Sequence, residues 1–248
     1  MILKKIVNFF GYRLVEKNKI KNEKILESSQ DIGIGEILEN LIEKNNLKKI
    51  IQVGANDGIK FDHLRKCIKK YDLNCILIEP VKDYFENLQM IYQNNNNIIL
   101  ENSAIVVNEC NNYIFKLKKN YEKIYPDFGS VISSFNKFHL KKHGIKNKHI
   151  EKIRVNSITF RELINKYKVI DLDILLIDSE GMDGFLVSNF LTEIKLRPII
   201  IFEWTHINHQ VLKKTLDLLK MNNYKIFRID NEILCFNKSK IRIDLNII

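Results

Sequence analysis

Short apolar runs alternate with amphipathic helical segments along most of this chain. The series opens at residues 34–42, where apolar positions recur at helical spacing and predict a helix. The elements predicted after it are, in order, strand 49–53, helix 61–71, strand 75–78, helix 81–92, strands 98–100 and 104–107, strand 172–177, helix 182–191, strand 198–202 and helix 211–221. Strands that are apolar throughout and separated by helices predict a parallel sheet with helices on both faces.

The pattern ends in two consecutive strands. Residues 224–229 and 232–236 are joined by Asp230-Asn231, a short turn that favours a hairpin. A hairpin at the end of an alternating α/β chain predicts a mostly parallel sheet whose last strand is antiparallel.

Two segments do not follow the alternation. Residues 1–32 predict an N-terminal basic amphipathic helical extension, which leaves residues 33–248 as one α/β domain. Residues 108–150 interrupt the pattern, and we expect a hairpin at Tyr113–Leu117 and a long insertion over the active-site edge of the sheet. A capping box formed by Thr159 and Glu162 predicts the start of a helix after this insertion.

The composition is that of an ordinary globular protein. The chain has 248 residues, of which 45% are hydrophobic and 28% charged, enough to bury a core without disulfides. No apolar run approaches the roughly 18 residues of a membrane-spanning helix. The four cysteines form no C-x-x-C pair and no cluster with histidine, and the N-terminus has no secretory pattern, so we expect a cytoplasmic protein.

The net charge of +10 is concentrated in two segments. Residues 1–25 carry +5 and residues 137–154 carry +6, while the rest is close to neutral. The first segment predicts either a helix on the inner face of a membrane or one docked on its own domain. The second also contains His139, His143 and His149, and either faces an anionic substrate or forms a solvated loop.

Candidate chemistry lies just after the predicted strands, because open α/β sheets bind ligands at the carboxyl ends of their strands. The first strand is followed by Gly54, Ala55, Asn56, Asp57 and Gly58, which lead into a helix. Such a turn permits close approach to the backbone, and a helix N-terminus offers N–H groups to a ligand. Glu79 follows the second strand and can accept both hydroxyls of a ribose, so the two features together predict a nucleoside site.

The turn does not match the common nucleotide motifs. It is not G-x-G-x-x-G, and the chain contains no Gly-Lys-Ser/Thr phosphate loop. S-adenosylmethionine, which has a carboxylate and an amine where a dinucleotide has phosphates, is therefore the predicted ligand. An NAD(P)-dependent sugar oxidoreductase and a non-catalytic module that binds anionic lipid or nucleic acid remain the alternatives.

Several runs of sequence together resemble one family. They are Ile51-Gln52-Val53-Gly54-Ala55-Asn56-Asp57-Gly58, Leu77-Ile78-Glu79-Pro80, Asn102-Ser103-Ala104-Ile105, Ile177-Asp178-Ser179-Glu180-Gly181 and Arg197-Pro198-Ile199-Ile200-Ile201-Phe202-Glu203. In this order they resemble the FkbM family of S-adenosylmethionine-dependent methyltransferases over roughly residues 48–205. Gln52 departs from the Asp that is more usual in the family.

The resemblance implies a class I methyltransferase fold, with a seven-stranded, mostly parallel sheet, helices on both faces and the last strand antiparallel. By position, residues 54–58 would hold the methionine part of the cofactor and Glu79 its ribose. Asn102, Ser103 and Ala104 would border the adenine.

The resemblance suggests methyl transfer to a hydroxyl of a glycan, nucleotide-sugar or small metabolite. A hydroxyl is a poor nucleophile at neutral pH, so the reaction requires a group that activates it. Asp178 and Glu180 are the predicted acceptor-side carboxylates, with Asp178 also beside the cofactor, and Glu203 and His206 are secondary candidates. These carboxylates predict either a general base or a Mg²⁺ site. A phosphate-bearing acceptor would suit residues 137–154, whereas nucleic acid is disfavoured because the Asp/Asn-Pro-Pro-aromatic and Pro-Cys motifs are absent.

Overall fold

The computed structural model describes residues 33–59, 62–107, 112–126 and 132–237. The predicted N-terminal extension, and with it the membrane contact expected of residues 1–25, lies outside these ranges. None of the helices within them combines the length and the apolar character needed to cross a bilayer.

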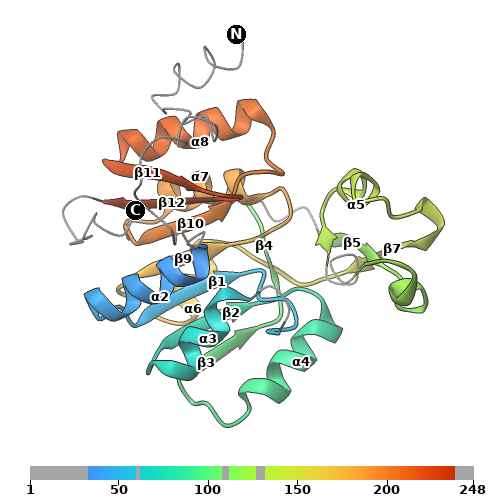
Figure 1. Ribbon diagram of the computed structural model, residues 1–248, viewed down its shortest axis with the longest axis horizontal. Coiled ribbons are helices and arrows are strands. Elements are labelled where there is room, and N and C mark those ends of the chain that lie inside the picture. The colour runs from blue at the N-terminus through green and yellow to red at the C-terminus, as the bar shows by residue number, and fades with distance from the viewer. Residues whose placement is uncertain (1–32, 60–61, 108–111, 127–131, 238–248) are drawn as a thin grey trace, which may run out of the picture. The chain divides into compact units, whose positions relative to one another are not determined.

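Seven strands of the described chain form the main sheet, in the spatial order β11-β12-β10-β9-β1-β2-β3 (Figure 1). They are β1 (Lys49–Val53), β2 (Asn74–Ile78), β3 (Ile98–Glu101), β9 (Ile174–Ile177), β10 (Ile199–Glu203), β11 (Tyr224–Ile229) and β12 (Glu232–Asn237). All neighbouring strands pair in parallel except β12, which is antiparallel to both β10 and β11. The predicted mostly parallel sheet with an antiparallel last strand is confirmed.

Three helices cover each face of this sheet. On one face α2 (Ile34–Asn45), α3 (His63–Lys70) and α4 (Lys82–Tyr92) contribute to one apolar cluster; on the other α6 (Phe160–Lys166), α7 (Asp183–Glu193) and α8 (His209–Met221) contribute to a second. Neighbouring strand residues alternate between the two clusters: Ile50 packs with the first and Ile51 with the second. Burying one such side chain stabilises the fold by about 2 kcal/mol, which explains the apolar character of every central strand.

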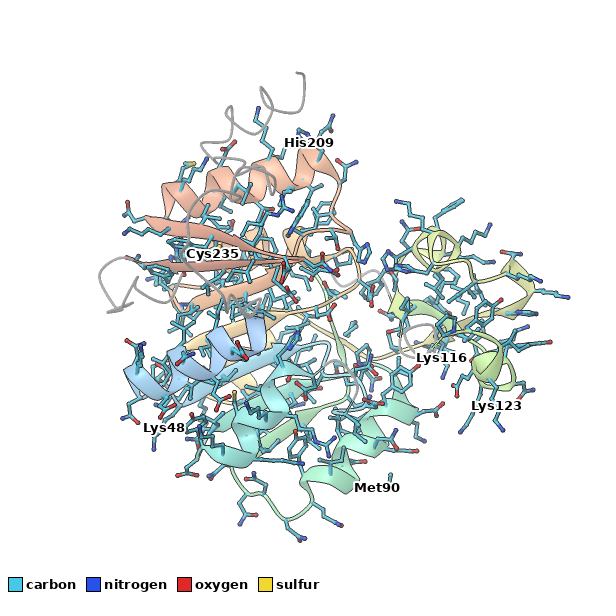
Figure 2. All side chains as sticks on the ribbon, in the orientation of Figure 1. Lys48, Met90, Lys116, Lys123, His209 and Cys235 are labelled. Carbon is cyan, nitrogen blue, oxygen red and sulfur yellow. The ribbon has the colours of Figure 1, made fainter. Side chains whose placement is uncertain are left out.

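Residues 104–158 hold two smaller strand groups. A parallel pair joins β4 (Ala104–Ile105) to β8 (Ser157–Ile158), and a three-stranded antiparallel sheet has the order β6-β5-β7. Its strands are β5 (Tyr113–Leu117), β6 (Ser133–Ser134) and β7 (Ile150–Arg154), accompanied by the 3₁₀ helices η2 (Lys119–Ile124) and η4 (Asn147–His149) and by α5 (Lys137–Lys142). Figures 1 and 2 show this group beside the main sheet, with Lys116 and Lys123 on it.

The small sheet corrects two expectations. Tyr113–Leu117 does not form a hairpin of its own, because it pairs with residues 150–154, far along the chain. Residues 137–154 are not a solvated loop either, since they contain α5 and β7 and bury His139, Leu140 and Ile145. Long-range pairing leaves no periodicity in the local sequence, which explains both differences.

The order in which the chain adds strands to the main sheet reverses at β1. The chain runs from β1 outward through β2 to β3 and then returns to β9 on the other side of β1. Here Gly54, with φ +82°, follows β1 so closely against β9 that a Cβ atom on it would lie 1.9 Å from the backbone oxygen of Asp178. Only glycine fits this crossing.

We therefore expect Gly54→Ala to lower the free energy of unfolding by about 3 kcal/mol or more, since the methyl group meets backbone that cannot rotate away. Gly144→Ala is the matched control, because Gly144 has φ +81° and no atom within 4 Å of the added Cβ. Its free energy of unfolding should fall by only about 1 kcal/mol, the cost of holding alanine in the left-handed backbone conformation. Urea denaturation of both variants measures the difference, and equal losses would contradict the packing argument.

Candidate functional site

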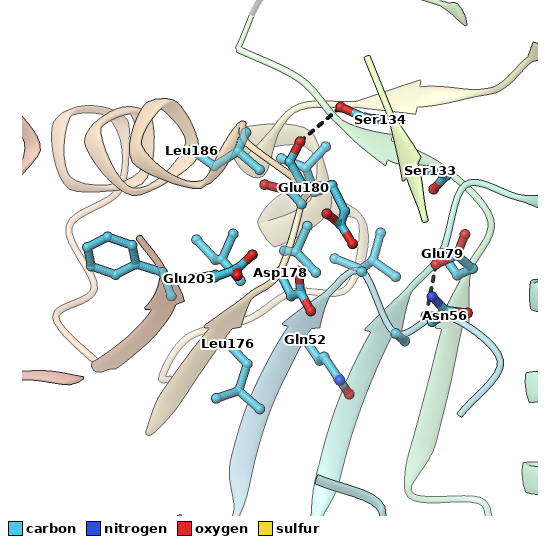
Figure 3. Close-up of a pocket in the computed structure, with 18 of the residues that line it drawn as sticks. Gln52, Asn56, Glu79, Ser133, Ser134, Leu176, Asp178, Glu180, Leu186 and Glu203 are labelled. Carbon is cyan, nitrogen blue, oxygen red and sulfur yellow. Dashed lines mark hydrogen bonds between the residues drawn. The ribbon is translucent and has the colours of Figure 1, made fainter. Parts of the chain in front are cut away.

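A cavity of about 630 Å³ opens at the carboxyl ends of the central strands (Figure 3). Residues that follow β1, β2, β9 and β10 line it, which places it where the strand order reverses. Ligands of open α/β sheets bind at this position, and the volume is typical of small-molecule sites.

The backbone N–H groups of the turn after β1 are already bonded to acceptors of the protein. All five N–H groups of residues 54–58 are hydrogen-bonded within the protein. The acceptors are the Ile78 carbonyl for Gly54 and Ala55, the Glu79 carboxylate for Asn56, the Asn56 side chain for Asp57 and the Ala55 carbonyl for Gly58. The expectation of N–H groups offered to a ligand is therefore wrong for this turn, and α3 begins only at His63.

Glu79 joins this turn to the end of β2. One carboxylate oxygen accepts the Asn56 N–H at 2.9 Å, and the other accepts the Val81 N–H at 2.8 Å. The side chain is buried, with the residue only 3% exposed, and burial raises its pKa to about 7. The predicted neighbours, glycine turn and acidic residue, are thus in direct contact in Figure 3.

The residues after β3 divide between two roles. Ser103 and Ala104 line the cavity, and the Ser103 hydroxyl donates to Glu101 at 2.6 Å. Asn102 does not line it, because its side-chain amide donates to the carbonyl oxygens of Glu79, at 2.8 Å, and Pro80. Asn102 therefore supports the backbone that carries Glu79.

Three predicted carboxylates meet beyond β9 and β10. Asp178, Glu180 and Glu203 all line the cavity, together with Glu232 at the start of β12. Desolvation by the surrounding protein, followed by the charges of Glu180 and Glu203, raises the pKa of Asp178 well above its usual range. Among the described residues Glu203 pairs with no lysine: its carboxylate accepts the Thr205 hydroxyl at 2.5 Å and lies 3.4 Å from the His206 ring nitrogen.

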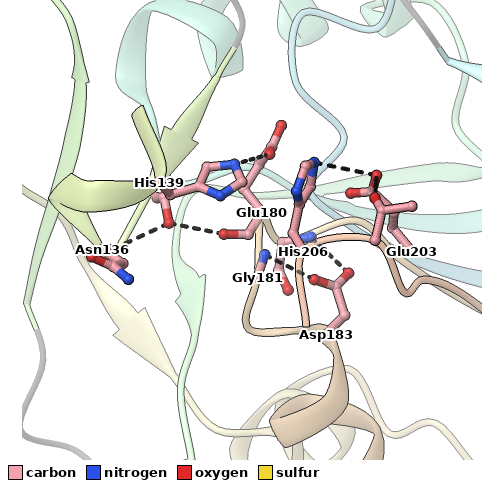
Figure 4. Close-up of polar contacts among 10 residues, drawn as sticks. Asn136, His139, Glu180, Gly181, Asp183, Glu203 and His206 are labelled. Atoms are coloured by element: carbon pink, nitrogen blue, oxygen red, sulfur yellow. Dashed lines mark hydrogen bonds and ion pairs between the residues drawn. The ribbon is translucent and has the colours of Figure 1, made fainter. Parts of the chain in front are cut away.

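The turn that carries Glu180 is held by Asp183. This carboxylate is fully buried and accepts the N–H groups of Ser179 and Gly181, each at 3.1 Å (Figure 4). Glu180 itself adopts φ +52°, a costly conformation for a residue with a side chain. Its side chain reaches the buried His139, with 2.6 Å between carboxylate oxygen and ring nitrogen.

The charge on the cavity wall is one-sided. Among the described lining residues six are carboxylic acids, namely Asp62, Glu79, Asp178, Glu180, Glu203 and Glu232, and none is lysine or arginine. A wall of this kind attracts cations and opposes phosphate groups. The charge distribution, not the net charge of the chain, decides which ligands the cavity favours.

Three lining side chains also carry buried polar atoms with no protein partner in the described chain. They are Gln52 Oε1, Asp62 Oδ2 and Ser179 Oγ. Buried polar atoms in native proteins are rarely left unsatisfied, so these three are positioned to bond a ligand held in the cavity. Two acceptors and one hydroxyl therefore point to a polar ligand that donates hydrogen bonds.

The structure brings together most of the predicted site residues. Those that line the cavity are Gly54, Ala55, Asn56, Glu79, Ser103, Ala104, Asp178, Glu180, Glu203 and His206. Asp57, Gly58 and Asn102 are not among the lining residues.

Sequence analysis missed Asp62 and Glu232, and it named His139 and His143 only as members of the basic segment 137–154. Asp62, which caps α3, brings a carboxylate 3.3 Å from the Gln52 amide. Glu232 lies opposite Glu203 because β12 runs antiparallel to β10. His139 and His143 reach the site from α5. The sequence offered three signals for these residues: a helix cap, an antiparallel last strand and two histidines four residues apart. None of these signals shows that the residue concerned lies at the cavity.

Comparison with known proteins gives a family and several structural neighbours. The family model described as "Methyltransferase FkbM domain" matches residues 52–226, well over half of the chain. No curated protein sequence matches. Solved structures that resemble this one include a methyltransferase FkbM from Methylobacillus flagellatus KT, with 15% identity and a TM-score of 0.43 over 80% of this chain and 47% of that one. This chain thus spans about half the length of that neighbour.

Two further neighbours have comparable scores. Fibrillarin from Aeropyrum pernix, solved with natively bound S-adenosyl-L-methionine, has 12% identity and a TM-score of 0.42 over 82% of this chain and 73% of that chain. A putative caffeoyl-CoA O-methyltransferase from Staphylococcus aureus has 12% identity and a TM-score of 0.43 over 94% of this chain and 89% of that chain.

The buried carboxylates predict a pH dependence of stability. The pKa values of Glu79 and Glu232 are raised from 4.5 to about 7, so the native state holds protons that the unfolded state has released. Stability falls as pH rises wherever the native state binds more protons. We therefore expect the free energy of unfolding to decrease between pH 5 and pH 8, by about 3 kcal/mol for Glu79 alone.

Chemical denaturation across this range measures the effect. Glu79→Gln should reduce the dependence on pH, whereas Glu86→Gln, at an exposed position on α4, should leave it unchanged. A free energy of unfolding that rises from pH 5 to pH 8 would contradict the prediction.

Proposed function

The chain belongs to the FkbM family of S-adenosylmethionine-dependent methyltransferases, and we propose that it methylates a hydroxyl of a glycan, nucleotide-sugar or small metabolite. One observation carries the proposal: the glycine turn and Glu79 are joined at the switch point of the sheet, in a cavity whose described lining residues include six carboxylic acids and neither lysine nor arginine. A cofactor with a sulfonium and an ammonium group matches that charge.

The residues of the cavity fit this cofactor. When bound, S-adenosylmethionine supplies an electrophilic methyl group for in-line displacement. Glu79 would accept the ribose hydroxyls with its remaining lone pairs. The unsatisfied oxygens of Gln52 and Asp62 are acceptors that suit the cofactor's ammonium group, and Ser179 offers a hydroxyl to its carboxylate.

The same contacts disfavour the alternatives. A dinucleotide needs backbone N–H groups or cations for its pyrophosphate, but the N–H groups of residues 54–58 are used internally and no lysine or arginine lines the described cavity. Nucleic acid and anionic lipid meet the same acidic wall. The lysines of residues 137–154 lie on α5, β7 and their connection, outside that wall, and are the candidate contacts for a phosphate-bearing part of the acceptor.

Activation of the acceptor hydroxyl falls to the carboxylates beyond β9 and β10. Asp178 retains a proton more readily than an isolated acid, because desolvation and the charges of Glu180 and Glu203 raise its pKa. A carboxylate of raised basicity is suited to take the proton of a hydroxyl. Asp178, Glu180 and Glu203 are also the oxygen ligands available for Mg²⁺, the second way to lower the pKa of the hydroxyl.

Cofactor binding is the first test. We expect S-adenosylmethionine to bind the full chain in calorimetric titration, with NADH and a generic oligonucleotide failing to bind. Glu79→Ala should weaken the affinity roughly 10- to 100-fold, the value of hydrogen bonds to a charged group. Glu86→Ala, an exposed glutamate on α4, should have no effect. NADH binding as tight as S-adenosylmethionine binding would contradict the proposal.

Methyl transfer is the second test. Labelled S-adenosylmethionine is incubated with nucleotide-sugars and glycan fragments, with and without Mg²⁺, and the site of the label is determined. Asp178→Asn should lower the rate about 100-fold or more, the usual contribution of a positioned base. Asp217→Asn, at an exposed position of α8, should retain it. Label on nitrogen or carbon, or an unaffected Asp178→Asn rate, would refute hydroxyl methylation by these residues.

A further inference from the structure

Four potential metal-ligand side chains converge at the mouth of the cavity. His139 and His143 come from α5 and its C-cap. Glu180 comes from the turn after β9 and His206 from the segment after β10, and Figure 4 shows these two side chains beside His139. Each residue offers one ligand atom, and these four atoms all lie within 4.8 Å of one another. Three segments that are distant in sequence thus present one compact set of donors.

The three imidazole rings form a mutual cluster. Their centroids are separated by 4.7 Å for His139 and His143, 4.5 Å for His139 and His206, and 5.1 Å for His143 and His206. The spacing of four residues in α5 places His139 and His143 on the same helix face. The Glu180 carboxylate closes the group through its 2.6 Å contact with His139.

Protonation does not explain this cluster. Burial lowers the pKa of His139 and His143, and for His143 the charges of His139 and His206 lower it further. Neutral imidazole is the form that binds metal ions, through the lone pair of a ring nitrogen.

We propose that His139, His143, Glu180 and His206 bind a divalent first-row transition-metal ion of the Zn²⁺ type. Three nitrogen donors and one carboxylate are the ligands that such ions prefer, whereas Mg²⁺ and Ca²⁺ require oxygen donors. Ligands around tetrahedral Zn²⁺ are roughly 3.4 Å apart at bond lengths of about 2.1 Å. Small rotations of side chains already within 4.8 Å reach that geometry.

The backbone around Glu180 is arranged to hold this carboxylate. Its φ of +52° is retained by two neighbours: the Ser134 hydroxyl donates to the Glu180 carbonyl at 2.9 Å, and Asp183 accepts the Gly181 N–H. Ser134 belongs to β6 of the small sheet, which also contacts α5. The small sheet therefore positions donors on both sides of the proposed ion.

The proposed ion would also face the reaction. His143, Glu180 and His206 line the same cavity as Asp178 and Glu203. A divalent ion here that accepts a fifth ligand would bind the acceptor oxygen and lower the pKa of its hydroxyl. This role rests on the proposed methyl transfer, whereas metal binding by the four side chains does not.

Metal binding is tested on the full chain, with any affinity tag removed and metal stripped by dialysis against a chelator. Calorimetry with Zn²⁺ and absorption spectroscopy with Co²⁺ should each give one ion per chain, with d–d bands of a nitrogen-rich site. Mg²⁺ at the same concentration should bind more weakly than Zn²⁺, because three of the four proposed ligands are nitrogen atoms. His143→Ala and His206→Ala should each weaken Zn²⁺ binding by more than about 100-fold, since even outer-shell partners cost ten- to hundred-fold.

His209→Ala is the matched control, because this exposed histidine starts α8 three residues after His206 (Figure 2). It should bind Zn²⁺ as the unchanged protein does. The thermal midpoint of each metal-free variant shows that it folds. No stoichiometric Zn²⁺ or Co²⁺ binding, or full binding by folded His143→Ala and His206→Ala, overturns the proposal, as does Mg²⁺ binding of equal strength. S-adenosylmethionine titration is measured separately, so failure of the methyltransferase proposal remains distinguishable.

Discussion

The contact between Gly54 and the backbone oxygen of Asp178 is the constraint on which this site depends. It brings the ends of β1 and β9 together where the strand order reverses. At residue 54 this contact leaves no room for a side chain. Because β1 ends there, the following turn folds back onto β2 and delivers the Asn56 N–H to Glu79. The cavity lies between these two strand ends, so its position follows from backbone packing before any catalytic side chain is considered.

The carboxylates at this edge of the sheet repel one another, and no lysine or arginine among the described lining residues offsets their charge. Asp183 and Glu79 are buried, and burial raises the pKa of both. Asp178 is exposed on the cavity wall, and its pKa is raised as well. Burying an acid without a cation is costly. Asp183 is offset by two backbone N–H groups and Glu79 by two more, but Asp178 has negative neighbours. Cationic ligands would relieve that repulsion, which connects the charge of the cavity to both proposals.

The small sheet adds a second layer to the site. Residues 112–154 interrupt the alternation of strands and helices, yet they supply His143 to the cavity wall, His139 to the Glu180 carboxylate and Ser134 to the Glu180 backbone. The main domain contributes to the same contact, because the Glu180 side chain extends from the turn after β9 to His139. An insertion of this kind can change the acceptor or the metal of a methyltransferase without disturbing the cofactor half of the cavity.

The sequence alone determined the main sheet and half of the site. Apolar runs such as residues 75–78 identify strands because both faces are buried, and the position after each strand identifies Gly54, Glu79 and Asp178 without knowledge of their contacts. Tertiary structure alone decided the rest. The pairing of residues 113–117 with 150–154, the approach of α5 to Glu180 and the placement of Glu232 beside Glu203 join positions far apart in the chain. Local patterns record burial and helix or strand period, but they carry no information about which distant segments meet.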